Sequence, residues 1–257
     1  MRILLTNDDG IDAPGLHALR QIAGALSDDV WVVAPEVNKS GAGHSLSLNE
    51  PLRMREINDR TFAVRGTPTD CVIMGVRHVI KDKKPDLVLS GVNRGANMAE
   101  DVTYSGTIAG AFEGTVVGIR SIAMSQAYGI ESSQNPRWEC AIEHGPNVVR
   151  KLLSIEWQTG VLMNVNFPDR TPDAIEGLAI TTQGKRESDL LSIDARHDTW
   201  GTPYYWLAYE RRRSKTVEGT DLWAVYNGHI SVTPLSMNLT HRPTQAALEP
   251  VFAAKRP

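Results

Sequence analysis

Residues 1–10, MRILLTNDDG, place a short apolar run directly before two adjacent carboxylates and a glycine. The run at residues 3–6 is apolar without alternation, which is typical of a strand that is covered on both faces of a sheet. The carboxylates of Asp8 and Asp9 repel each other and would gain nothing from a core. They therefore require either open water or a cation, and the other residues that reach this place decide between the two.

Short apolar runs alternate with amphipathic stretches through the first two thirds of the chain. Further strands are expected at residues 30–34, 45–48, 61–64, 87–90, 122–124 and 161–165. Helices are expected at residues 16–26, from residue 67 onward, at residues 106–117 and around residues 138–152. Because strands that alternate with helices are parallel and joined by right-handed crossovers, the sequence predicts a doubly wound α/β sheet.

Two of these helices carry local signals at particular residues. Thr67 is expected to cap the second helix, with Pro68 at its first position and Asp70 in its first turn, where a carboxylate is favourable. In the last helix, Gly145 and Pro146 fall in the middle of the pattern. Since an interior proline kinks a helix, we expect one kinked helix here.

After residue 168 the alternation between strands and helices degrades, and residues 185–200 are polar and irregular. Strand-like stretches remain at residues 204–209 and 230–233. We therefore expect residues 1–168 to form the core of the protein. Residues 169–257 would then form a C-terminal β-rich extension involved in oligomerisation. The run of three arginines at residues 211–213 is expected to be a solvated face.

Composition excludes several classes of protein. The chain of 257 residues is long enough for one large domain or two small ones, and its net charge of -3 provides no basic field for a nucleic-acid duplex. The two cysteines, Cys71 and Cys140, form no disulfide framework and are expected to be buried, reduced thiols. No apolar stretch approaches the roughly 20 residues of a membrane span, and the first apolar run is too short for a signal peptide. The cytoplasm is the expected location.

Polar residues follow three of the predicted strands at their carboxyl ends, where an open parallel sheet binds its ligands. Asp8 and Asp9 follow the first strand, Ser40 lies in the loop after the second, and Asn93 follows the strand at residues 87–90. All four offer oxygen donors, which suit Mg²⁺, Mn²⁺ or Ca²⁺ rather than zinc. Two carboxylates could also mark a helix N-terminus, and the serine or the asparagine alone could be a turn residue. Taken together, the four residues favour a metal site.

A second polar feature opens the helix at residues 106–117. Ser105, Gly106 and Thr107 place backbone amides and two hydroxyls at its start, which form an anion site or, alternatively, an ordinary helix cap. A cation and an anion site at one edge of a sheet point to phosphate. His44 can donate a proton or a hydrogen bond there, although a loop histidine is more often structural. The sequence lacks a dinucleotide glycine motif after the first strand, a Walker loop, a nucleophile-elbow serine and a metal-binding histidine pair.

Several motifs, in chain order, resemble those of the SurE family of survival proteins and 5′-nucleotidases. They are TNDDG, VAPEVNKSGAGHS, GTPTDC, SGVNRGAN, YSGTIAGAFEG and TDLWAVYNGHISVTPL. The resemblance covers nearly the whole chain and implies a Rossmann-like core. It also implies a metal-dependent phosphatase of nucleoside monophosphates, with 3′-nucleotidase and exopolyphosphatase activities as further options. One Mg²⁺ or Mn²⁺ per subunit would be held by Asp8, Asp9, Ser40 and Asn93, and the assembly would be a homodimer or homotetramer that can exchange C-terminal segments.

The expected chemistry is an in-line attack on phosphorus. Asp8 and Asp9 are expected to contribute to it by holding the metal. The residues expected to stabilise charge on the phosphoryl oxygens are Asn97, Ser105, Gly106 and Thr107, with His44 beside them. One rival is a phosphatase that forms an aspartyl-phosphate, but its two aspartates are separated by one residue, whereas those here are adjacent. The other rival is a metal-dependent nucleotide sensor that binds without turnover.

Overall fold

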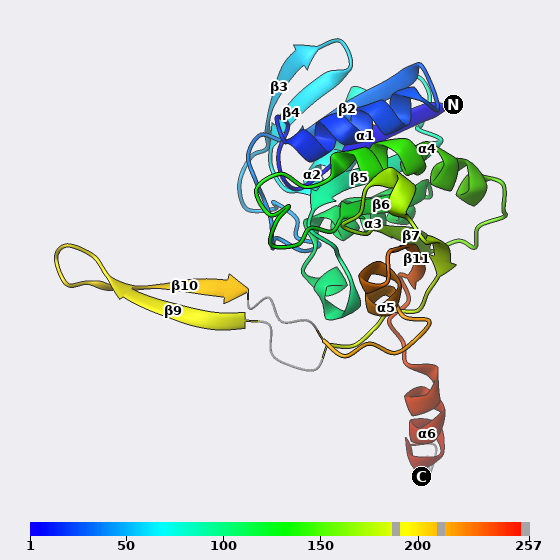
Figure 1. The fold of residues 1–257 in the computed structure, drawn as a ribbon. Helices are drawn as coiled ribbons and strands as arrows, with labels where there is room; N and C mark the ends of the chain where they lie inside the picture. The colour runs from blue at the N-terminus through cyan, green and yellow to red at the C-terminus, as the bar shows by residue number, and fades with distance from the viewer. Residues whose placement is uncertain (187–190, 210–213, 253–257) are drawn as a thin grey trace, which may run out of the picture.

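The structure, a computed structural model, describes residues 1–186, 191–209 and 214–252. A nine-stranded sheet in the order β3-β4-β2-β1-β5-β6-β7-β11-β8 runs through the molecule (Figure 1). Its strands are β1 (Arg2–Thr6), β2 (Asp29–Pro35), β3 (Arg53–Asn58), β4 (Thr61–Arg65), β5 (Leu87–Arg94), β6 (Arg120–Gln126), β7 (Val161–Phe167), β8 (Gly177–Ile180) and β11 (His229–Ser236). The six strands from β4 to β7 in this order are parallel, while β3 and β11 each run antiparallel to a neighbour. The predicted α/β, mostly parallel sheet is confirmed.

Helices cover both faces of the sheet (Figure 1). The α-helices of the described residues are α1 (Pro14–Gly24), α2 (Pro68–Met74), α3 (Gly106–Val116), α4 (Trp138–Leu153), α5 (Asp221–Tyr226) and α6 (Arg242–Phe252), and of these α6 extends away from the sheet. Successive side chains of a strand point to opposite faces, and β1 shows this directly: Ile3 and Leu5 belong to the cluster with α1 and α4, while Leu4 belongs to the cluster with α2. Because both faces are buried, the strand is apolar without alternation, as the sequence predicts.

The helix signals at residues 67–70 are borne out, and so is a single helix through residues 145–146. Thr67 and Asp70 form a reciprocal capping box, in which the Thr67 Oγ1 accepts from the Asp70 amide and the Asp70 Oδ2 accepts from the Thr67 amide. α4 runs unbroken through Pro146 as a single helix. Gly145 lies against Ile22 of α1, so closely that a Cβ there would stand 2.8 Å from the Ile22 side chain.

Two expectations about secondary structure are wrong. Residues 45–48 form no strand, and the edge strand is β3, whose mostly exposed side chains show no buried face. Residues 185–200 are not irregular throughout, because β9 (Leu191–His197) pairs antiparallel with β10 (Pro203–Tyr209). β8 was missed as well. All three missed strands, β3, β8 and β9, are defined by pairing with a partner strand, and an unburied strand carries little hydrophobic signal.

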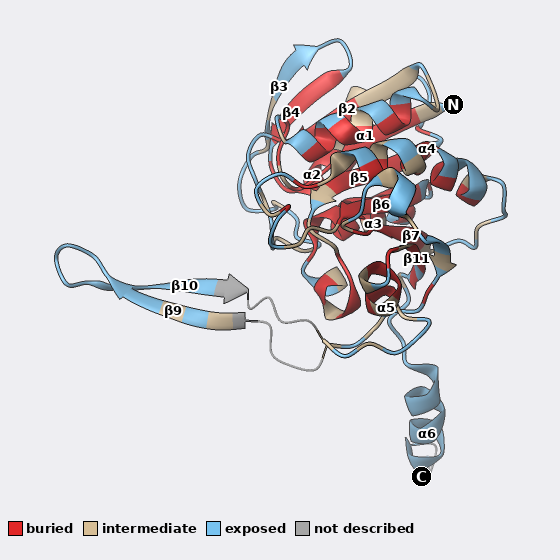
Figure 2. Ribbon diagram, viewed as in Figure 1, coloured by how far each residue is buried: buried red, intermediate tan, exposed pale blue. Residues whose placement is uncertain are grey.

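The C-terminal third divides between the sheet and two projecting segments. β11 and β8 continue the main sheet beyond β7, and α5 packs against β11. The β9–β10 hairpin and α6 extend away from the sheet and are mostly exposed (Figure 2). The predicted face of three arginines lies outside the described residues. Among the described helices, none combines the length and apolar character that crossing a membrane would require. Cys71 and Cys140 are buried and unpaired, as predicted.

Candidate active site

The topology of the sheet reverses between β1 and β5. From β1 the chain proceeds to β2 and β4 on one side, and from β5 it proceeds to β6 and β7 on the other. The crevice at the carboxyl ends of two such strands is where doubly wound sheets bind ligands. β1 ends at Thr6, and Asp8 and Asp9 follow within three residues. Asn93 lies near the end of β5, where it pairs with Ser125 of β6. Three of the four predicted metal ligands therefore come from the two strands at the switch point.

Asp8 is buried, with an exposed fraction of 3 %, and is held from the start of α3. The Thr107 hydroxyl donates to its Oδ1 at 2.6 Å. Gly106 lies directly against the same side chain, since a Cβ at this glycine would stand 2.7 Å from the Asp8 Cβ and 3.0 Å from its Oδ2. The start of α3 and the carboxylate after β1, predicted separately from the sequence, are therefore in contact.

Asp9 is half-buried and connects the loop after β2 with the end of β5. Its Oδ2 accepts from the backbone amide of Arg94 at 3.1 Å, and its Oδ1 accepts from the Asn38 side chain at 3.4 Å. The Asn38 Oδ1 in turn accepts from the Ser40 amide at 2.8 Å. Ser40 itself is exposed. The loop that carries it is tied to the aspartates by this asparagine and by a bond from the Lys39 amide to the Asp8 carbonyl at 2.7 Å.

The two carboxylates lie in an environment that opposes their ionisation. Burial raises the pKa of Asp8 to about 6, and the charge of Asp9 adds to this, while hydrogen bonds from Thr107 act in the opposite direction. Burial also raises the pKa of Asp9, against the opposing effects of the Arg94 amide and charge. No ion pair among the described residues includes either aspartate. Two adjacent carboxylates that form no ion pair within the described residues are suited to a bound metal ion, which would supply positive charge.

The donor set fits a hard cation. Asn93 donates its amide nitrogen to the Gly95 carbonyl at 2.7 Å, and this bond leaves its Oδ1 as the atom available for a ligand. Within the described ranges, no group of three or more histidine, cysteine, aspartate and glutamate side chains could hold a metal ion. Besides the two carboxylates, the asparagine and serine oxygens are the predicted further donors at this site. Such a mixed oxygen set suits Mg²⁺ or Mn²⁺.

The residues predicted to bind phosphate differ in what they contact. Ser105 caps α3, with its Oγ accepting from the Ile108 amide at 3.0 Å, so its hydroxyl proton can be donated to a ligand. Thr107 is fully buried and directs its hydroxyl to Asp8. Asn97 is buried and donates its side-chain amide to the Ser125 hydroxyl at 2.9 Å, which leaves one of its two N–H groups for another acceptor.

His44 lies beside this group, at the edge of a cavity. Its Nε2 is 3.1 Å from the Glu113 Oε2, and its ring stacks on Phe112 with centroids 5.9 Å apart. A cavity of about 570 Å³ is bounded by these two rings, by Ser105 and by the strand ends of β8 and β11. Since Ser105 also opens α3, the cavity reaches the same helix start as Asp8.

Several contacting residues were missed by the sequence reasoning. Asn38 and Arg94 bind Asp9, and Thr107 positions Asp8 in addition to its predicted place beside phosphate. Asn164 and Asn166 of β7 donate to the Asn97 carbonyl. A signal for this last pair exists in the sequence, because two asparagines at alternate positions of an otherwise apolar strand point to one face and need polar partners there.

The fold and the site define a doubly wound α/β protein with its candidate active site at the topological switch point. The chain belongs to the SurE family: the family model described as "Survival protein SurE" matches residues 3–189.

Similar proteins match over nearly their full lengths. A "5'-nucleotidase SurE" from Methylorubrum extorquens (strain PA1) is 60% identical over 254 residues, covering 99% of this chain and 100% of the relative. A "5'-nucleotidase SurE" from Azorhizobium caulinodans is 59% identical over 255 residues, with the same coverage. The crystal structure of the SurE protein from Aquifex aeolicus superposes with a TM-score of 0.84 at 42% sequence identity, covering 98% of this chain and 99% of that one.

Proposed function

We propose that this protein is a metal-dependent phosphatase that hydrolyses nucleoside monophosphates to nucleoside and phosphate. The observation that carries the proposal is the contact between the carboxylate pair and the start of α3, where Thr107 and Gly106 lie directly against Asp8. A cation site and an anion site that share a residue are suited to a phosphate ester. The name "5'-nucleotidase SurE", carried by relatives about 60% identical over the whole chain, supports a nucleotide substrate.

One Mg²⁺ or Mn²⁺ per subunit is proposed, held by Asp8, Asp9, Ser40 and Asn93. When bound, such an ion polarises phosphoryl oxygens and lowers the pKa of a coordinated water. The carboxylates match this role, because their charges have no cationic partner among the described ion pairs.

The chain's own residues would orient the phosphate group. The Gly106 amide points out of the first turn of α3, where helix N-termini attract anions, and the Ser105 hydroxyl has its proton available for a phosphoryl oxygen. Asn97 would offer its remaining N–H group. Thr107 would hold Asp8 in one rotamer, and His44 would contact the substrate from the cavity side.

Assembly into a homodimer or homotetramer is proposed through the two projecting segments. The hairpin and α6 expose a set of large apolar side chains, which are Ile193, Trp200, Tyr205, Trp206, Leu207, Leu248, Val251 and Phe252. Large apolar side chains exposed on a projecting segment are typical of protein–protein interfaces.

Phosphate release from the full-length protein tests the proposal. The panel contains 5′- and 3′-nucleoside monophosphates and polyphosphate, each with Mg²⁺, with Mn²⁺ and with a chelator. We expect hydrolysis of 5′-monophosphates that depends on metal; cleavage of 3′-monophosphates or polyphosphate would extend the substrate range. Metal-dependent nucleotide binding without release of phosphate would instead support the alternative, a non-catalytic sensor. Hydrolysis that persists in chelator would contradict the metal site.

A further inference from the structure

The segment from Asn97 to Ser105 joins β5 to α3 and carries a proposed phosphate-binding residue at each end. Within it, Ala99 has a φ of 51°, a left-handed conformation that is unusual for a residue with a side chain. Its side chain is fully buried. A residue keeps such a conformation only when its surroundings impose it.

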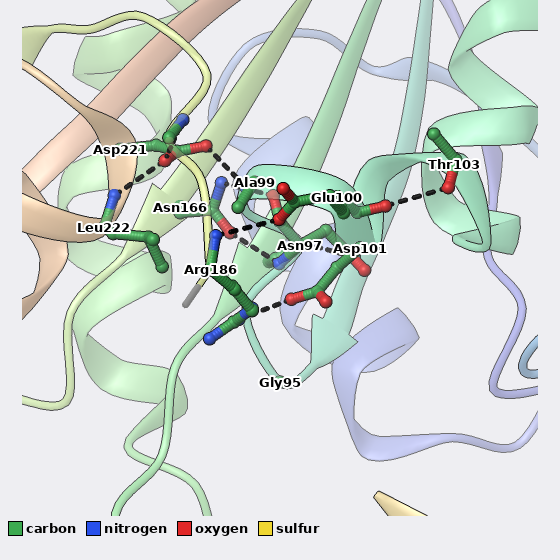
Figure 3. A network of polar contacts seen from close by, with 12 residues as sticks. Gly95, Asn97, Ala99, Glu100, Asp101, Thr103, Asn166, Arg186, Asp221 and Leu222 are labelled. Atoms are coloured by element: carbon green, nitrogen blue, oxygen red, sulfur yellow. Dashed lines mark hydrogen bonds and ion pairs between the residues drawn. The ribbon is translucent and has the colours of Figure 1, made fainter. Parts of the chain in front are cut away.

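Both polar groups of Ala99 are held by residues from the C-terminal third of the chain (Figure 3). Its amide donates to the Asp221 Oδ2 at 2.9 Å, and its carbonyl accepts from the Gln183 side chain at 2.9 Å. Asp221 is fully buried, and its other oxygen accepts from the amides of Gly184 and Leu222 at 2.8 and 2.7 Å. One carboxylate therefore joins the loop, residue 184 and the start of α5.

An ion pair holds the next part of the segment. The Arg186 Nη2 lies 2.5 Å from the Asp101 Oδ2, and the exposed fractions of these side chains are only 13 % and 11 %. The Arg186 amide also donates to the Glu100 Oε2 at 3.0 Å (Figure 3). A buried ion pair is weak support for stability, because desolvation of its charges offsets their attraction. Its directional bonds nevertheless restrict the loop to one arrangement.

The first residue of the segment is held on the opposite side by β7. The Asn97 amide donates to the Asn166 Oδ1 at 2.8 Å, and its carbonyl accepts from Asn164 and Asn166 at 2.8 and 3.1 Å. The loop is thus fixed by β7 at one end and by the C-terminal third along its length. Preorganised donors contribute to catalysis only when they are held in place before the reaction.

We propose that Asp221 and the Arg186–Asp101 pair are positioning residues for the reaction, which act by fixing the loop that carries Asn97 and Ser105. The inference rests on the proposed phosphatase function. It assigns a role in phosphate binding to Asp221 and Arg186, which lie outside the predicted core of residues 1–168, and to Asp101 as the ion-pair partner of Arg186.

The test compares two arginine substitutions. Arg2 and Arg186 have nearly equal side-chain exposure, 12 % and 13 %, and each pairs with aspartate, but Arg2 lies at the start of β1, at the opposite end of that strand from the site. Arg186→Met should lower kcat/KM for AMP by roughly tenfold or more, as the loss of supporting contacts does in other sites. Arg2→Met should leave kcat/KM close to that of the wild type. The metal-induced rise in melting temperature should persist in both variants. Asp8, Asp9 and Asn93 do not belong to the loop of residues 97–105 that the Arg186 substitution would loosen.

Asp221→Asn provides a second measurement if Arg186→Met does not fold. It keeps the size of the side chain but replaces one acceptor oxygen with an NH2 group, which cannot accept from a backbone amide. It should lower kcat/KM with the metal response intact. Adding Ala99→Gly should restore part of the loss, because glycine adopts a positive φ without the steric cost of a Cβ.

Binding of inorganic phosphate in the presence of Mn²⁺ is measured by calorimetry on the same proteins. If the wild type hydrolyses no nucleotide, the phosphatase proposal fails, and the affinity for phosphate then decides this inference alone. Equal losses of kcat/KM and of phosphate affinity in Arg186→Met and Arg2→Met would overturn it. Weaker phosphate binding in Arg186→Met and Asp221→Asn only would support it.

Discussion

The Asp8→Asn substitution should stabilise the metal-free protein at neutral pH while removing most of its response to metal. Asparagine has nearly the shape of aspartate and can still accept the Thr107 hydroxyl through its oxygen, so the hydrogen bond seen at 2.6 Å has an acceptor in the variant. The substitution removes the negative charge. The free energy that changes is therefore the cost of ionising a buried carboxylate beside Asp9.

The size of this cost follows from the pKa of Asp8. Burial raises it from 3.8 to about 6, and about two pKa units correspond to about 3 kcal/mol. Since the folded-state pKa is above the unfolded one, this contribution to stability is fully present below pH 3.8 and is lost as the pH rises through about 6. Metal-free wild type should thus lose about 3 kcal/mol between pH 4 and pH 8 from this group, and Asp8→Asn should not.

Thermal unfolding in chelator, at pH 4 and at pH 8, measures the effect. For a chain of this size, about 3 kcal/mol corresponds to a shift in melting temperature of roughly 6–12 °C, and this shift should separate the variant from the wild type at pH 8 only. Asp12→Asn, which removes an exposed carboxylate from the same loop, is the control for net charge. Mn²⁺ should raise the melting temperature of the wild type by mass action and should have little effect on Asp8→Asn. The same pH dependence in the variant and the wild type would refute the reasoning.

Three further outcomes are expected. Thr107→Val removes the hydroxyl that favours the ionised form of Asp8, so metal titrations followed by melting temperature should shift to higher metal concentration with an unchanged circular dichroism spectrum. Gly106→Ala places a Cβ 2.7 Å from the Asp8 Cβ, so both the metal response and phosphate release should fall; an unchanged response would mean that the loop absorbs the methyl group. Deletion from residue 241 onward removes α6, whose residues are exposed, and light scattering should report a smaller assembly with an unchanged melting temperature at the same protein concentration. A native-sized assembly after this deletion would contradict a role of α6 in oligomerisation.

The main sheet and the site at its switch point could be predicted from the sequence because both depend on short-range patterns. Residues 3–5 of β1 are all apolar because Ile3 and Leu5 face one helical layer and Leu4 faces the other. In a parallel sheet every strand ends at the same edge, so polar residues that directly follow strands converge there whatever the details of packing. This reasoning brought Asp8, Asp9 and Asn93 to one place, and the contacts of Asp9 with the Arg94 amide agree with it.

Only the tertiary structure revealed which residues support that site. The edge strand β3 and the hairpin strand β9 form by pairing across exposed surfaces, where no buried face leaves a periodic pattern. The bond from Ala99 to Asp221 spans 122 positions in the chain, and the pair of Arg186 with Asp101 spans 85. Asp101, Arg186 and Asp221 are each, read alone, ordinary polar residues of a loop or a helix start. Their roles arise because β11 and β8 extend the sheet beyond β7 and α5 packs against β11. This arrangement brings the C-terminal third of the chain against the loop after β5.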